Sequence, residues 1–78
     1  MRAKLLSHDP SLVEGFRLGG IEGKAVRNKK ESLDSFNSLV KEEGLALIIL
    51  TSQCYKTIES EVEEYRKESS TPLIVVIN

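Results

Sequence analysis

Apolar residues in this chain fall into short extended segments that alternate with segments of helical spacing. The extended candidates are residues 3–7, 23–27, 45–51 and 73–77. The last two, LALIILT and LIVVI, are continuous apolar runs rich in branched side chains. Because continuous apolarity indicates a strand buried on both faces, these two runs predict strands in the middle of a parallel sheet.

Two of the three helical segments carry clear start signals. The first begins at Asp9, whose side chain is suited to cap a helix, and Pro10 suits the first helical position, where a missing N–H costs nothing. The second begins at Asn28, which is followed three residues later by Glu31 in a variant of the capping box. Gly44 is predicted to stop the second helix, because glycine readily adopts the left-handed conformation that follows a C-cap.

Each helical segment has one apolar face, as expected for helices that pack on a sheet. The stripes are Leu12, Val13 and Phe16 in the first helix, Leu33, Phe36, Leu39 and Val40 in the second, and Cys54, Ile58, Val62 and Tyr65 in the third. The third helix, capped by Thr51 or Ser52, carries mostly charged side chains on its opposite face. That charged face is predicted to be exposed to solvent.

The alternation reads β-α-β-α-β-α-β over a single domain, residues 1–78. Right-handed crossovers turn such an order into a parallel sheet with helices on both faces. We therefore expect an α/β fold with four strands in the order 2-1-3-4, as in a shortened flavodoxin-like or Rossmann-like domain. The sequence stops at Asn78, where a helix would normally follow, which predicts a C-terminal segment that is either missing from this sequence or absent from this variant.

Composition narrows the class of protein. Eleven Lys and Arg against twelve Asp and Glu give a net charge of −1, which argues against a general nucleic-acid binder. The single cysteine, Cys54, excludes an internal disulfide and fits a reducing cytosol. The longest apolar run, residues 45–50, is far shorter than the roughly 20 residues that span a bilayer. We therefore expect a cytoplasmic protein that reaches a membrane only through a partner.

Side chains suited to chemistry gather only at the predicted strand ends. Ser7, His8 and Asp9 follow the first strand, and Thr51 and Ser52 end the third. A His–Asp pair there would suit acid–base work, but three consecutive residues rarely have the geometry of a triad. A phosphoacceptor receiver would need an acidic pair after the first strand and an Asp after the third, but Asp9 is the one acid at these strand ends. We predict no catalytic, cofactor-binding or metal-binding residues, and keep a receiver-like or ligand-binding module, and more weakly a small hydrolase, as alternatives.

A basic cluster is the other charged feature of the chain. Lys24, Arg27, Lys29 and Lys30 surround the start of the second helix, with no acidic residue among them. The cluster is suited to hold an acidic partner. The cluster is equally explained as a solvated edge between a strand and a helix. Two of its lysines lie at the positive end of the helix dipole, so we expect a nearby acidic side chain to compensate their charge.

The stretch GFRLGGIEG, residues 15–23, holds four of the five glycines. A dinucleotide-binding fingerprint needs G-x-G-x-x-G at the start of a helix, whereas these glycines follow a different spacing at the end of one. The carbonyl end of a helix repels phosphate, so the stretch is not a phosphate loop. Gly19 and Gly20 are predicted to stop the helix and form a turn, and Gly15, inside the helix, suggests close approach of another backbone.

The same stretch resembles the F subunit of the V/A-type (vacuolar/archaeal-type) rotary ATPases. The family shows a Gly-Phe-(basic or polar)-Leu-(small)-Gly-Ile/Val pattern at this place. Asp9 matches the family's Gly-Asp loop, with His8 in place of the glycine, and LALIILTSQCYKTIESEVEEY and TPLIVVIN are similar to its later segments. Arg2 and Lys4 depart from the apolar first strand of the family. The residues that carry the motif, and a candidate partner interface, are Asp9, Gly15, Phe16, Arg17, Leu18, Gly19, Gly20 and Ile21.

The resemblance implies a non-catalytic rotor subunit without a cofactor. It implies that the chain binds the coiled-coil D subunit of the central stalk, and meets the catalytic head and other stalk subunits, so that ATP hydrolysis or synthesis is coupled to ion transport. It also implies a C-terminal tail that this sequence does not contain. The expected location is the cytoplasm, peripheral to the membrane through the ATPase complex, without direct insertion and without nucleic acid as a partner.

Overall fold

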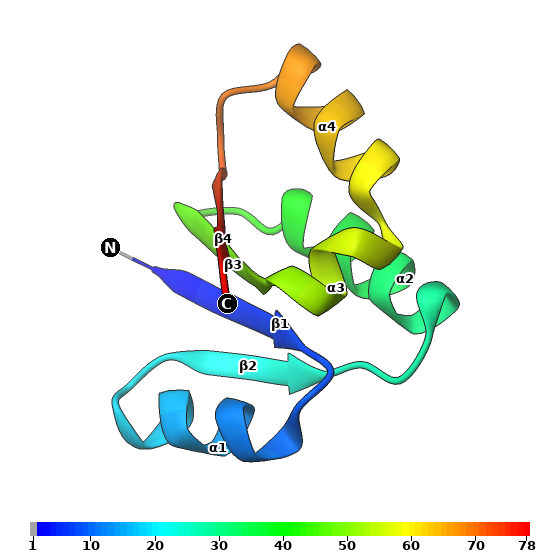
Figure 1. Ribbon diagram of the computed structural model, residues 1–78. Helices are drawn as coiled ribbons and strands as arrows, with labels where there is room; N and C mark the ends of the chain where they lie inside the picture. Colours follow the sequence, from blue (N-terminus) through cyan, green and yellow to red (C-terminus); the bar gives the residue numbers. More distant parts are fainter. Residues whose placement is uncertain (1) are drawn as a thin grey trace.

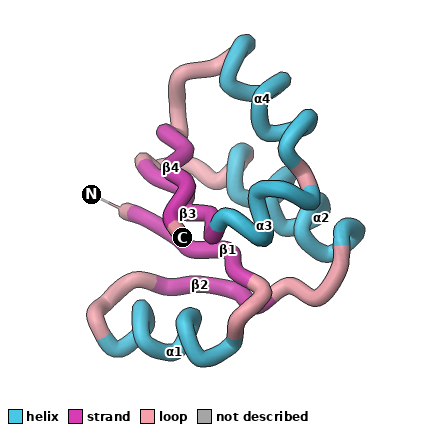
Figure 2. Tube along the Cα trace, in the orientation of Figure 1, coloured by secondary structure: helices cyan, strands magenta, loops and turns pink. Residues whose placement is uncertain are grey.

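A four-stranded parallel sheet organises the computed structural model, which describes residues 2–78 (Figure 1). The elements in chain order are β1 (Ala3–Ser7), α1 (Pro10–Leu18), β2 (Glu22–Ala25), α2 (Lys29–Val40), β3 (Leu47–Thr51), α3 (Ser52–Thr57), α4 (Glu59–Glu68) and β4 (Leu73–Ile77). Strands and helices alternate along the chain except where α3 and α4 follow one another (Figure 2).

The strands lie in the order β2-β1-β3-β4 and all neighbours are parallel. Helix α1 covers one face of the sheet, and α2, α3 and α4 lie on the other (Figure 1). The α/β class, the strand order and the helices on both faces are thus confirmed. Leu5 pairs with Gly23 on one side and with Ile49 on the other, and Ile49 pairs with Val75.

Both predicted helix starts are present. The carboxylate of Asp9 accepts a hydrogen bond from the backbone N–H of Ser11 at 2.9 Å. The side chain of Asn28 accepts one from the backbone N–H of Glu31 at 2.9 Å. The reciprocal bond differs from a capping box, because the Glu31 carboxylate accepts from the backbone N–H of Arg27 instead of Asn28.

Gly44 does not end α2, contrary to the sequence-based prediction. The helix ends at Val40, and Lys41 at the C-cap has ordinary right-handed dihedrals. The backbone N–H groups of Lys41 and Glu42 bond to carbonyls of the last turn, so the helix closes without glycine. Gly44 has φ +83° and forms a separate turn that leads into β3.

The predicted third helix is broken into α3 and α4 at Ile58. The hydroxyl of Thr57 donates to the carbonyl of Cys54 at 2.7 Å, and the N–H of Ile58 bonds to the carbonyl of Tyr55 three residues back. This side-chain bond competes with the regular helical ladder. The apolar stripe survives the break, because Cys54, Ile58 and Val62 are all completely buried.

The main core lies between the sheet and the layer of α2, α3 and α4. Its members are Leu6, Val26, Phe36, Leu39, Leu45, Ile48, Leu50, Cys54, Ile58, Val62 and Ile74. The Phe36 and Tyr65 rings meet edge to face with centroids 5.9 Å apart. Burial raises the pKa of the Cys54 thiol, so this cysteine is a small core residue and not a nucleophile.

β4 is not a strand buried on both faces, and that prediction is wrong. Ile74 is the one residue of β4 that is buried, whereas Leu73 is 60% and Val75 38% exposed. The strand lies at the edge of the sheet, where no helix covers its second face. β2 and β3 are also shorter than expected, since β2 starts at Glu22 and ends at Ala25 and β3 starts only at Leu47.

Candidate functional site

The polar side chains at the strand ends serve local structure. The hydroxyl of Ser7 accepts from the backbone N–H of Asp9 at 3.0 Å, and Thr51 donates to Ser7 at 3.5 Å. The Asp9 carboxylate is held by the first turn of α1. His8 Nε2 is buried and has no partner among residues 2–78. Ser7, His8 and Asp9 therefore form no triad, and the hydrolase alternative loses the arrangement that it requires.

No cluster of three or more His, Cys, Asp or Glu side chains with metal-binding geometry occurs between residues 2 and 78. None of the helices within these residues is suited to span a bilayer.

The basic cluster is largely neutralised by neighbouring acids. Arg27 pairs with Glu31 at 2.9 Å, Lys30 pairs with Asp34 at 2.9 Å, and Lys29 lies 3.8 Å from Glu61. The hydrogen bonds from Arg27 hold the pKa of the Glu31 carboxyl below its usual range. The expected compensating acids are therefore present, and Lys24 is the member of the cluster without an ion pair in the described part of the chain.

The glycine-rich stretch lies at the carbonyl end of α1, as predicted. The N–H groups of Gly19 and Gly20 bond to the carbonyls of Phe16 and Arg17, each at 3.0 Å, and Ile21 also bonds to Phe16. Gly20 has φ +94°, a conformation that favours glycine. This end of the helix offers carbonyl oxygens, so it has no affinity for phosphate.

No backbone outside helix α1 lies near Gly15. A Cβ at Gly15 would meet no heavy atom within 4 Å, so the close approach expected from the sequence does not occur within the chain. The tight position is Gly23, where a Cβ would stand 3.1 Å from both the Cβ and the carbonyl oxygen of Leu5. The reason for glycine in β2 is thus its packing against β1.

The two glycines predict opposite effects of alanine. Gly15→Ala is expected to stabilise the isolated chain by up to about 1 kcal/mol, because alanine favours a helix interior and the space is open. Gly23→Ala is expected to destabilise it by about 1–3 kcal/mol, because the new methyl group overpacks against Leu5. Urea unfolding followed by circular dichroism measures both, and equal effects of the two variants would contradict the structure.

The residues of the motif are mostly on the surface. Leu18 is 82% exposed, Arg17 is exposed at the end of α1, and Phe16 is only partly buried. Helix α1 contains no fully buried residue. The candidate interface residues Asp9, Gly15, Phe16, Arg17, Leu18, Gly19, Gly20 and Ile21 are therefore accessible or nearly so.

An apolar part of the sheet beside α1 lacks a covering helix. Residues that pair across neighbouring parallel strands point to the same face of the sheet. Leu5, Ile49 and Val75 pair in this way across β1, β3 and β4, and their exposed fractions rise from 0% to 8% to 38% toward the edge. Leu47 and Leu73 pair in the next row, and Ile77 follows Val75 on the same face. We call Leu47, Ile49, Leu73, Val75 and Ile77 the open sheet face.

Helix α1 accounts for this gradient. It connects β1 with β2 and lies over those two strands, while the helices after β2 and β3 lie on the opposite side (Figure 1). Beside α1 the exposed side chains of this face belong to β4, namely Leu73 and Val75, whereas Ile49 and Thr51 of β3 are buried. Sequence reasoning missed this surface because it treated the 73–77 run as interior, although the strand order 2-1-3-4 already places that run at an edge.

The edge of β4 is less available than its face. The backbone N–H of Leu73 bonds to Ala46, so the carbonyl of Ile74, one residue on, points away from β3. The guanidinium of Arg66 donates to that carbonyl at 2.7 Å and also pairs with Glu63 at 2.8 Å. A charged side chain across a sheet edge hinders the addition of another strand. The open sheet face therefore favours a helical partner over a strand.

Comparison with known proteins reveals similarity to ATP synthase subunits. The profile of the ATP synthase (F/14-kDa) subunit family matches residues 7–78. The F subunit of the A-type ATP synthase of Methanothermobacter thermautotrophicus is 33% identical over 70 residues, which are 88% of this chain and 65% of that protein. The F subunit of the V-type ATP synthase of Thermus thermophilus is 29% identical over 69 residues, which are 88% of this chain and 66% of that protein. The chain spans about two thirds of the length of these curated relatives.

A solved structure has the same fold. The F subunit of the V-type ATP synthase from Archaeoglobus fulgidus superposes with a TM-score of 0.81 at 19% sequence identity. The match covers 99% of this chain and 96% of that one. Similarity at this identity concerns the arrangement of strands and helices.

Proposed function

The chain belongs to the ATP synthase F-subunit family, and we propose that it is a subunit of the central stalk of a V/A-type rotary ATPase. The F subunit is an accessory subunit and not a catalytic one. In the proposed role the chain binds the coiled-coil D subunit and turns with it. It thereby supports the coupling of ATP hydrolysis or synthesis to ion transport, in the cytoplasm and peripheral to the membrane.

The open sheet face is the observation that carries this proposal. A helix of the D subunit, laid beside α1, would bury Leu73, Val75 and Ile77 and complete the second layer of the sheet. Parallel sheets are stable when both faces are covered, so the contact also stabilises a small domain. The exposed end of α1, with Arg17 and Leu18, is proposed to form the rim of the same contact.

Size-exclusion chromatography of the chain mixed with its cognate D subunit tests the role. We expect one complex of equal stoichiometry that elutes ahead of either protein. The matched control is an unrelated coiled coil of the same length, which is expected to leave the chain in its own peak. Separate elution of the chain and its cognate partner would contradict the proposed role, and co-elution with both coiled coils would show unspecific adhesion.

A further inference from the structure

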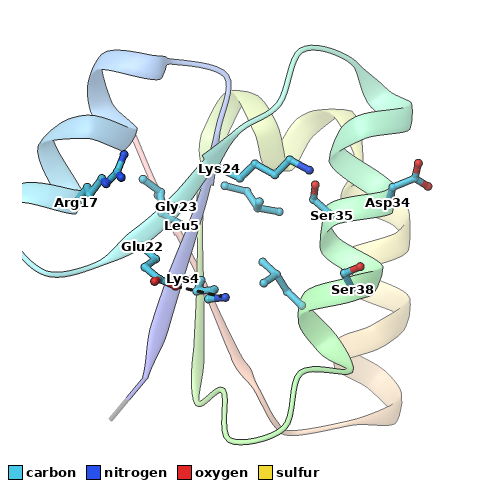
Figure 3. Close-up of a pocket in the computed structure, with 11 residues that line it drawn as sticks. Lys4, Leu5, Arg17, Glu22, Gly23, Lys24, Asp34, Ser35 and Ser38 are labelled. Carbon is cyan, nitrogen blue, oxygen red and sulfur yellow. Dashed lines mark ion pairs between the residues drawn. The ribbon is translucent and has the colours of Figure 1, made fainter.

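A polar cleft lies between β2 and α2, on the side of the sheet opposite α1. β2 is an edge strand, and α2 packs over β1, so a space remains beside β2. The cleft has a volume of about 520 Å³, within the range of small-molecule sites. Figure 3 shows its two walls: Glu22 and Lys24 come from β2, and Ser35 and Ser38 from α2.

The ammonium group of Lys24 is the free charge of the cleft. Lys4 pairs with Glu42 at 3.1 Å and lies 3.5 Å from Glu22. Arg17 lies 3.8 Å from Glu14, and Asp34 pairs with Lys30 at 2.9 Å. Lys24 has no ion pair or hydrogen bond in the described part of the chain.

The surrounding acids do not neutralise Lys24. Glu31 lies close enough for Lys24 to help lower its pKa, but Arg27 already donates to both oxygens of that carboxylate. Glu22 lies 3.5 Å from Lys4, and the carboxylate of Asp34, which lines the cleft, pairs with Lys30 at 2.9 Å (Figure 3). The uncompensated charge at the cleft is therefore positive.

The hydroxyl of Ser35 is the second group that lacks a partner. Ser35 is 8% exposed, and its Oγ is buried without a hydrogen bond within residues 2–78. Figure 3 shows this hydroxyl on the side of α2 that faces β2, with the Lys24 side chain extending toward it. A buried hydroxyl without a partner is unfavourable, so it marks a position where a bound group is stabilised.

We propose that this cleft binds a small oxyanion, namely phosphate or the phosphate group of a small phosphomonoester. Lys24 Nζ and Ser35 Oγ donate to it from opposite walls, and Ser38 lies one turn further along α2. Hydrogen bonds between a charged donor and an anion are stronger than those between neutral groups. Leu6 and Leu39, both buried core residues, also line the cleft. The donors Lys24 and Ser35 lie on the side of the sheet opposite the open sheet face, so the proposal does not rest on the stalk role, although Arg17 of the proposed rim also lines the cleft.

Titration of the 78-residue chain with inorganic phosphate, followed by two-dimensional amide NMR at constant ionic strength, tests the proposal. We expect saturable shifts confined to residues 22–24 and 34–39. Lys24→Gln is expected to weaken binding about tenfold or more, because the charge is lost, and Ser35→Ala about threefold to tenfold. A parallel titration with glycerol 3-phosphate distinguishes the two sources: tighter binding than that of phosphate assigns the cleft to phosphomonoesters.

The matched controls are Lys67→Gln and Ser70→Ala, which change an exposed lysine and an exposed serine elsewhere. Both are expected to bind phosphate like the unchanged chain. Shifts that fail to saturate, that spread over all lysines, or that persist in Lys24→Gln would overturn the proposal. Lys24 is exposed, so its variant is expected to fold, and a far-ultraviolet spectrum identical to that of the unchanged chain verifies this.

Discussion

Phe36→Ala is expected to leave the chain largely unfolded at 25 °C. Phe36 is 1% exposed, belongs to the main core and packs edge to face on Tyr65. Truncation of a buried phenylalanine costs about 3–5 kcal/mol, because transfer energy is lost and a cavity remains. A chain of this length has about 4–12 kcal/mol of stability in total, near the lower end when the domain is small. Urea unfolding monitored by circular dichroism measures the loss.

The other phenylalanine is the matched control. Phe16 lies on α1 and is only partly buried, so Phe16→Ala is expected to cost about 1–2 kcal/mol and to leave the chain folded. If Phe36→Ala does not fold at all, Phe36→Leu, which retains most of the volume, still permits a measurement. Equal losses for Phe16→Ala and Phe36→Ala would show that α1 packs as tightly as the main core, contrary to the structure.

Val75→Glu is expected to weaken the complex with the D subunit by about 100-fold or more. The carboxylate would be buried against an apolar helix without a partner, which costs about 3–5 kcal/mol in an interface. In the free chain Val75 is 38% exposed at the edge of the sheet, so the variant is expected to fold. Isothermal titration calorimetry of each variant with the D subunit measures the dissociation constant, and thermal unfolding of the free chain verifies the fold.

Asn37→Glu is the matched control for this variant. It makes the same change of charge at an exposed position of α2, on the opposite side of the sheet, and is expected to bind the D subunit normally. Leu18→Ser tests the rim of the interface and is expected to weaken binding less than Val75→Glu. Normal binding by Val75→Glu together with loss of binding by Leu18→Ser would move the interface from the sheet to the glycine-rich end of α1.

Local signals in the sequence predicted the elements well. Asp9 and Asn28 begin their helices because their short polar side chains accept hydrogen bonds from free backbone N–H groups two or three residues further along. The stripe of Cys54, Ile58 and Val62 is buried because the apolar face of a helix packs against the core and its polar face stays in water. Prediction failed where the cause was a single competing bond, as in the break at Ile58, where the Thr57 hydroxyl bonds to a helix carbonyl.

The candidate site was predictable only in part. The GFRLGGIEG stretch was identified as a helix end and as the carrier of the family resemblance. Its exposure was not predictable from the sequence. The run LIVVI looks the same in a central strand as in an edge strand, and only the predicted strand order 2-1-3-4 indicated that β4 lies at an edge. The serines at positions 32, 35 and 38 of α2, spaced by three, are the sequence signal for the polar face of this helix.

By itself the sequence determined the fold class, the strand order and the family. Apolar periodicity, helix caps and glycines depend on residues that are close together in the sequence, so they can be recognised without the tertiary structure. Only the tertiary structure decided which surfaces are free. Whether Val75 faces solvent, whether Gly15 or Gly23 is crowded, and whether Ser35 finds a partner all depend on which segments lie across the sheet from them. Those contacts join residues far apart in the chain, and no local pattern encodes the space that they leave open.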